Sequence, residues 1–122
     1  MAKKSSQARL TIPKDIWDIA KFDDFDRKDF GFFILPDSRV VIANRSIGKL
    51  LDYQFLGSCT FDQKHRFFVP KNVDEYLGAG NIYYFTTSLK GSIVYFYKTS
   101  SESLVKLQNY QLNIYPLPEK NH

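Results

Sequence analysis

Two stretches of this chain follow one pattern: RLTIPKDI at residues 9–16 and RFFVPKNV at residues 66–73. Each reads arginine, an apolar residue, any residue, a β-branched residue, proline, lysine, aspartate or asparagine, and a β-branched residue. The copies start 57 residues apart, nearly half of the 122-residue chain. A repeat on this scale predicts two copies of one supersecondary unit. Each copy places two basic residues beside a strand-to-helix corner, which favours an elongated anionic partner over a small-molecule substrate.

Each copy predicts a strand, a proline corner, a short helix and then a hairpin. In the second copy, Pro70 stands where a helix can start, because the first helical position does not need an N–H donor. Gly78 is placed to end that helix. Apolar residues at i, i+3 and i+4 give it a buried face. The face is expected at Val73, Tyr76 and Leu77, and the strands at residues 55–61, 66–69, 82–87 and 92–98.

The first copy has the same layout with a longer loop. Pro13 opens a short helix, on which Trp17 lies off the apolar line and is expected to be partly buried. An acidic loop, residues 22–29, follows the helix, and Pro36 with Asp37 suits the centre of a type I turn. The helix face is expected at Ile16, Ile19 and Ala20, the hairpin strands at residues 32–35 and 40–43, and one more helical turn at 46–51.

Composition supports a sheet-rich fold, since 16% of the residues are aromatic, with 11 Phe and 8 Tyr. The length suits one domain that buries its own core. We therefore predict a mainly β, small barrel-like single domain over residues 1–122, with short helices. It consists of pseudo-repeats at about 5–47 and 53–98 and a C-terminal extension at 99–122. In that extension, residues 99–102 form a capping-box pattern, and the alternation around Leu112 and Ile114 indicates a strand.

Several kinds of chemistry lack the residues they need. Cys59 is the sole cysteine, so an internal disulfide and a cysteine zinc site are excluded. The two histidines, His65 and His122, come without the serine context of a hydrolytic triad. The acidic loop 22–29 lacks the central glycine and terminal glutamate of a calcium loop. We therefore expect no enzyme activity, no cofactor and no metal site.

The location expected for the protein is cytoplasmic. No apolar stretch approaches the length of a membrane span, and the N-terminus lacks the apolar segment of a secretory signal. A membrane is therefore not an expected partner.

The candidate nucleic-acid-binding residues are the cations of the two corners. The formal net charge is +4, and basic residues precede the first acid at the N-terminus. Arg9 and Lys14 belong to the first corner, and Arg66 and Lys71 to the second, with Lys64 shortly before it. Bound to phosphates, such cations release counterions and make the affinity depend on salt. In the alternative interpretation, Arg66 pairs with Asp62 and the lysines are simply solvated.

Aromatic residues beside these cations also have two interpretations. Phe67 and Phe68 fall on opposite faces of a strand, so at least one is expected in the core, and the other can stack on a base. Tyr95 and Tyr97 share a strand face opposite Phe96. That face is either a stacking platform for RNA bases or an ordinary half-buried sheet surface.

The layout resembles the swapped-hairpin family of AbrB, MazE and MraZ-type proteins. Its signature, an Asp-x-x-x-Arg followed by apolar residues, proline, a short helix and a hairpin, matches Asp62, Arg66, Pro70 and the helix end at Leu77-Gly78. In the first copy Arg9 and Pro13 match, whereas Ser5 replaces the aspartate. The resemblance implies an interleaved barrel that binds DNA through basic loops and strands, with two units in one chain as in MraZ-type members. The matching positions are Arg9, Lys14, Arg66 and Lys71.

A weaker resemblance, in size and general character, is to small PUA-like regulators of the PrgU type, which are linked to RNA-level control. We therefore expect a non-enzymatic nucleic-acid-binding regulator of gene expression, DNA-binding and AbrB-like. The first alternative is a PUA-like RNA-binding post-transcriptional regulator. A further alternative is an antitoxin-like protein-interaction module that uses the acidic loop 22–29, and a homodimer also remains open.

Overall fold

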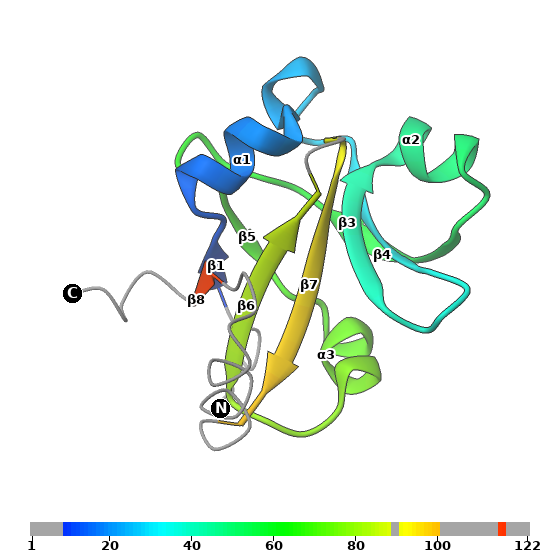
Figure 1. Cartoon of the computed structure of the whole chain (residues 1–122), viewed down its shortest axis with the longest axis vertical. Helices are drawn as coiled ribbons and strands as arrows, with labels where there is room; N and C mark the ends of the chain where they lie inside the picture. The colour runs from blue at the N-terminus through cyan, green and yellow to red at the C-terminus, as the bar shows by residue number, and fades with distance from the viewer. Residues whose placement is uncertain (1–8, 89–90, 101–114, 117–122) are drawn as a thin grey trace, which may run out of the picture.

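The computed structural model describes residues 9–88, 91–100 and 115–116 (Figure 1). Short helices alternate with antiparallel strands along the chain. The elements are β1 (Arg9–Thr11), α1 (Lys14–Ala20), the 3-10 turn η1 (Phe22–Asp24), β2 (Phe30–Ile34), β3 (Val40–Asn44), α2 (Arg45–Leu50), β4 (Gln54–Cys59), β5 (Arg66–Phe68), α3 (Lys71–Leu77), β6 (Ile82–Thr87), β7 (Ile93–Thr99) and β8 (Tyr115–Pro116).

The strands of the two repeated stretches pair with each other. β1 and β5 form a separate antiparallel two-stranded ribbon, with Leu10 opposite Phe67. These two residues hold the same position in the repeat, so the ribbon has an approximate twofold axis through their pair. Both side chains are buried, whereas Arg9 and Phe68, also opposite each other, are exposed. Alternation along the strands therefore gives the ribbon one core face and one outer face.

The other strands form one sheet in the order β4-β2-β3-β7-β6-β8. The hairpins β2–β3 and β6–β7 meet at the central β3–β7 pair, and β4 and β8 lie outside them. The element order strand, helix, hairpin is thus the same in both halves of the chain. The mainly β fold with short helices is confirmed, and the described strands form two antiparallel sheets without a closed barrel.

Aromatic rings fill the core between the ribbon and the larger sheet. Phe67 contacts Phe32, Phe96 and Phe85 at ring-centroid distances of 5.9, 5.9 and 6.1 Å. All four rings are buried. Edge-to-face pairs add about 0.5–1.5 kcal/mol each beyond burial. This packing fixes the ribbon against the sheet and therefore fixes the direction of its outer face.

Trp17 is fully buried, which corrects the expected partial burial. Phe22 and Phe61 pack against its ring edge-to-face, with centroids 5.4 and 4.9 Å away. The indole Nε1 donates to Asp23 Oδ1 at 2.9 Å, so burial leaves this polar atom paired. The acidic loop thus folds over α1 by its apolar residues and leaves its carboxylates exposed.

The proline corners differ slightly from the expectation. Pro13 and Pro70 precede the helices as N-caps, and α1 and α3 start one residue later, at the lysines. Gly78 ends α3 as predicted, with φ of 90°. On α3, Val73 is buried but Tyr76 is exposed, and its hydroxyl donates to the Ser38 carbonyl at 3.1 Å. The tyrosine therefore reaches the β2–β3 turn and does not enter the core.

Two expectations for the C-terminal extension fall mostly outside the described residues. The capping box at 99–102 continues beyond residue 100, and the strand around Leu112 and Ile114 lies in the undescribed stretch. No helix among the described residues is long and apolar enough to cross a membrane.

Candidate nucleic-acid interface

The outer face of the β1–β5 ribbon brings together two of the predicted cations and one aromatic ring. Register places Arg9 opposite Phe68 and Thr11 opposite Arg66. The Arg9 guanidinium carbon lies 5.5 Å from the centre of the Phe68 ring, within cation–π range. Phe68 leaves 53% of its surface exposed, although most large aromatic side chains are buried. The expectation that one of Phe67 and Phe68 belongs to the core is confirmed.

Asp62 holds both arginines of this face. Its Oδ2 accepts from Arg66 Nε at 2.7 Å and from Arg9 Nη2 at 3.2 Å. Its Oδ1 accepts the backbone N–H groups of Lys64 and Arg66, both at 2.9 Å. The backbone hydrogen bond from Arg66 is the main cause that holds the pKa of Asp62 well below its usual value. The carboxylate is therefore ionised and orients both guanidinium groups.

The arginine pairing expected as the alternative is thus present, and it includes Arg9, which lies 53 residues away from Asp62. Exposed ion pairs of this kind contribute little to stability. They do restrict two long side chains to one region of the surface. Arg66 uses only Nε for Asp62, so neither terminal amino group is bound by a residue that the structure describes.

The three predicted lysines do not join this cluster. Lys14 and Lys71 follow opposite ends of the antiparallel ribbon, because each starts the helix after its own strand. Lys14 pairs with Asp18 at 2.9 Å, and this hydrogen bond raises the pKa of Lys14. Lys64 lies on the exposed turn that Asp62 begins, and neither it nor Lys71 has an ion pair among the described residues. The lysines therefore flank the arginine pair.

His65 closes the turn before β5. Its φ of 64° is left-handed, and its carbonyl accepts the Ile12 N–H at 3.1 Å, which ties the turn to β1. The imidazole stacks on Trp17 with centroids 3.9 Å apart. Burial lowers the pKa of His65 below its ordinary value. At neutral pH the imidazole is therefore uncharged, and its role here is to support the turn before β5.

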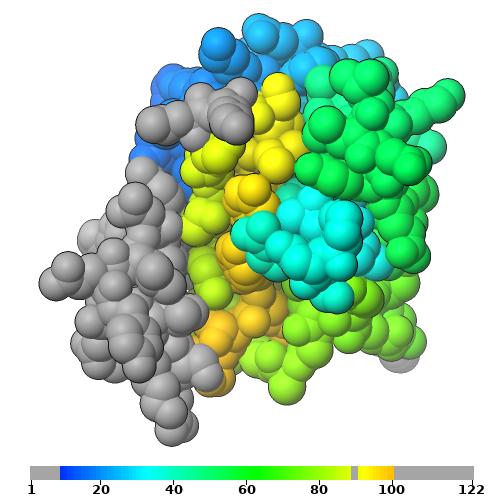
Figure 2. All heavy atoms as spheres, turned by 45° about the vertical axis from the view of Figure 1, so that its right-hand side comes forward, coloured from blue at the N-terminus to red at the C-terminus, as the bar shows by residue number. Residues whose placement is uncertain are grey.

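A second aromatic surface lies on the sheet face opposite the ribbon. Figure 2 shows the yellow and orange atoms of β7 at the surface beside the cyan β2–β3 hairpin. Tyr95 and Tyr97 are half-buried on this face, while Phe96 points into the core. Arg39 lies 4.6 Å over the Tyr95 ring and pairs with Asp37 at 2.8 Å. The expected alternation of tyrosines and phenylalanine along β7 is thus present.

Metal and thiol chemistry finds little support in the described residues. They contain no group of three or more His, Cys, Asp or Glu side chains able to hold a metal ion. Cys59 is buried, and burial raises the pKa of its thiol well above the ordinary value, so it is not a ready nucleophile.

Comparison with known proteins gives no neighbour. No family model matches the chain, and neither the curated proteins nor the solved structures contain a match.

Proposed function

We propose that this protein binds duplex DNA through the outer face of the β1–β5 ribbon and regulates gene expression. The observation that carries the proposal is the pairing of the repeated strands, which places Arg9, Arg66 and the exposed Phe68 on one outward face. The major groove of B-DNA is wide enough for a two-stranded β-ribbon. The resemblance to AbrB-like proteins at Asp62, Arg66 and Pro70 points the same way.

The arginines have a chemistry suited to reading bases. The two terminal amino groups of Arg66 can donate together to O6 and N7 of guanine, the commonest specific contact in the major groove. Asp62 orients this side chain in advance, so less side-chain entropy is lost on binding. Phe68 offers an apolar surface for a thymine methyl group.

The flanking lysines suit the DNA backbone. Lys14 and Lys71 follow the two ends of the ribbon, and Lys64 lies on the adjacent turn. In a groove-bound ribbon, cations at its ends face phosphates, which position a protein without reading sequence. Several such contacts make the affinity fall steeply with salt.

The test is fluorescence anisotropy with a labelled random-sequence duplex and a single-stranded RNA of equal length, each across a salt titration. The double variant Arg9→Gln/Arg66→Gln should weaken duplex binding more than about tenfold. Its fold should persist, because Asp62 still accepts two backbone N–H groups. Arg39→Gln is the matched control, since Arg39 is another ion-paired arginine, but lies outside the ribbon. Full duplex affinity in the double variant would overturn the site assignment.

A second candidate function is supported by the tyrosine face. Tyr95 and Tyr97, with Arg39 over one ring, form a partly exposed aromatic surface of the kind on which unpaired RNA bases stack. If the protein prefers single-stranded RNA, and Arg39→Gln weakens that binding while the ribbon variant does not, this face is the interface. The two variants thus assign the partner and the surface in one experiment.

A further inference from the structure

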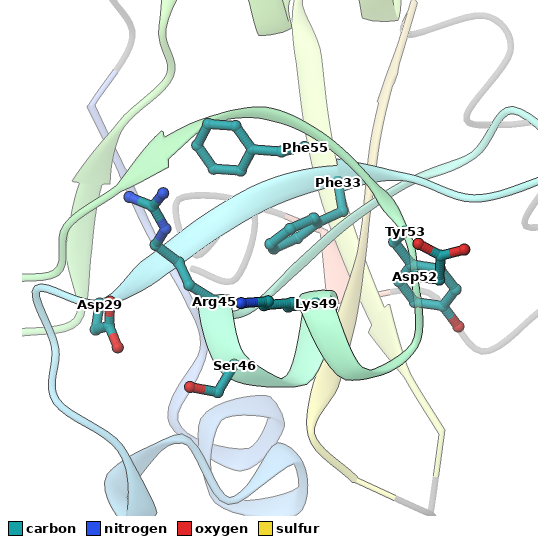
Figure 3. Close-up of a pocket in the computed structure, with 8 residues that line it drawn as sticks. All are labelled: Asp29, Phe33, Arg45, Ser46, Lys49, Asp52, Tyr53 and Phe55. Carbon is teal, nitrogen blue, oxygen red and sulfur yellow. The ribbon is translucent and has the colours of Figure 1, made fainter.

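A pocket of about 370 Å³ lies between α2 and the sheet edge formed by β2 and β4 (Figure 3). It is on the sheet face opposite the ribbon, because Phe33 lines it, whereas the neighbouring Phe32 contacts Phe67 of the ribbon. This volume is within the range of small-molecule sites. The pocket residues that matter here are two rings, two cations and two acids: Phe33, Phe55, Arg45, Lys49, Asp29 and Asp52.

Two glycines make room for the aromatic wall. A Cβ on Gly48 would lie 2.3 Å from the Phe33 ring, and one on Gly31 would lie 2.8 Å from the Phe55 ring. The two rings meet edge-to-face with centroids 5.6 Å apart. Phe55 nevertheless remains 45% exposed towards the pocket side of β4. The Phe55 ring is therefore held in place by Phe33 and still exposes part of its surface to solvent.

Both cations of the pocket are exposed and stand outside the ion pairs of the described residues. Arg45 and Lys49 lie four residues apart on α2, so they share one side of the helix. Neither forms an ion pair with a residue that the structure describes. Arg45 lies 4.7 Å over the Phe55 ring, and Figure 3 shows its guanidinium beside that ring. A planar cation and a planar ring together provide a stacking surface next to a positive site.

Hydrogen bonds hold the main chain of Arg45 at the start of α2. Its N–H donates to the Asp29 carbonyl at 2.9 Å, and the buried Asn44 side chain donates to the same oxygen at 2.9 Å. Asn44 also caps α2 by accepting the Ser46 N–H at 3.0 Å. The start of α2 is therefore anchored, which fixes the backbone position from which the Arg45 side chain extends.

We infer that this pocket binds a nucleoside monophosphate. Its phosphate pairs with Arg45 and Lys49, and its base stacks on the Phe55 ring or on the guanidinium above it. Asp29 and Asp52 also line the pocket and balance the two cations. They accept hydrogen bonds from ribose hydroxyl or base amino groups, and they oppose the additional charge of a triphosphate. The inference is independent of DNA binding, since the ribbon is on the other side of the sheet.

The test is a titration of the ¹⁵N-labelled full chain with AMP at low salt, followed by amide chemical shifts. Concentrations up to about 10 mM populate even a millimolar complex. Saturable shifts at α2 and β4 are expected for AMP, with weaker binding of adenosine, inorganic phosphate and ATP. A single-stranded hexanucleotide that binds more than about tenfold tighter than AMP would assign the site to a strand and overturn the free nucleotide.

Charge and ring variants complete the test. Lys49→Gln and Phe55→Leu should each weaken AMP binding about tenfold, because each removes one of the two recognition elements. Lys21→Gln removes the same charge at the end of α1, outside both candidate sites, and should leave AMP binding unchanged. The inference is wrong if AMP gives no saturable shift in the folded wild-type chain, or if Lys49→Gln/Phe55→Leu binds AMP as well as Lys21→Gln does.

Discussion

Trp17 and His65 stack face to face, with ring centroids 3.9 Å apart and planes 2° apart. The pair joins α1 to the turn before β5, and burial lowers the pKa of the imidazole below 6.5. A histidine with a lowered pKa contributes stability that is complete above its unfolded pKa. That contribution is lost as the pH falls below about 6.5 towards the folded value.

We therefore expect wild type to lose more stability than His65→Asn between pH 7.5 and pH 5.5. Asparagine tolerates the left-handed φ of 64° and does not titrate. Urea unfolding at both pH values gives the change in unfolding free energy for each protein. Any contribution of His122 is the same in both proteins and cancels. If the unfolding free energies of the two proteins depended equally on pH, folding would not lower the pKa of His65.

Lys98 anchors α3 to the second hairpin through Asp74. Its Nζ lies 2.8 Å from Asp74 Oδ1, which also accepts the Tyr83 hydroxyl at 2.6 Å, and the Lys98 side chain is only 9% exposed. Lys98→Met should destabilise the fold by about 1–2 kcal/mol, because the carboxylate loses a charged donor. Lys71→Met is the control, because Lys71 is an exposed lysine at the start of α3. It should change the unfolding free energy little. Denaturant unfolding measures both.

The same cluster predicts a loss of stability in acid. Burial opposes ionisation of Asp74, but the hydrogen bonds from Lys98 and Tyr83 outweigh it and lower the pKa of the carboxyl below 3.8. A carboxyl with a lowered pKa stabilises the fold above its unfolded pKa, and this stabilisation disappears as the pH falls through the folded pKa. Asp74→Asn should therefore lose less stability than wild type between pH 5 and pH 3. If both proteins lost the same unfolding free energy over this range, the lowered pKa of Asp74 would be contradicted.

Gly48 is expected to resist replacement, although alanine normally favours a helix by up to about 1 kcal/mol. Its Cβ would lie 2.3 Å from the Phe33 ring, so Gly48→Ala should cost about 1–3 kcal/mol through overpacking. Gly57→Ala is the matched control, since the nearest atom to its Cβ, on Val73, would be 3.6 Å away. Thermal unfolding compares the two. Adding Phe33→Leu to Gly48→Ala should recover part of the loss.

Asp62→Asn tests how the Asp62 carboxylate holds Arg9 and Arg66 on the proposed DNA-binding face. Asparagine keeps an oxygen for the N–H groups of Lys64 and Arg66, but it releases the charge that both arginines share. Non-specific duplex affinity should rise, and the slope of log affinity against log salt should steepen by about 1. Discrimination between sequences should fall, because the arginines are no longer oriented. Anisotropy across a salt series, with two duplexes of different sequence, measures the salt slope and the discrimination. An unchanged slope would contradict the proposed role of Asp62.

Local patterns predicted the elements of this fold well. Alternation and turn residues located the β2–β3 hairpin, expected at 32–35 and 40–43 and observed at Phe30–Ile34 and Val40–Asn44. Proline and glycine located both ends of α3 within one residue. Burial was predicted less well at Trp17, because Phe61, one of the two rings that pack edge-to-face on it, is far from its helix in sequence.

The candidate interface was only partly predictable, because part of it also depends on residues far apart in sequence. The pairing of Asp62 with Arg66 is local, four residues apart, and it was expected as one of two interpretations. The pairing of Arg9 with Asp62 depends on β1 lying beside β5, which no local pattern encodes. The cations Arg45 and Lys49 were missed altogether. Their sequence signal was a pair of basic residues four positions apart, beside the predicted helical turn at 46–51 and close to Phe55.

The pairing of β1 with β5 also governs the order in which the chain can fold. The strand β1 emerges from the ribosome before its partner, which ends at residue 68, so Leu10 has no strand to cover it until β5 has been synthesised. Contacts so distant in sequence form late and slowly, because a long loop must close first. Until then, β1 of one nascent chain has an unsatisfied edge that matches β5 of any neighbouring copy. Strand exchange at this stage would rebuild the same ribbon between two molecules.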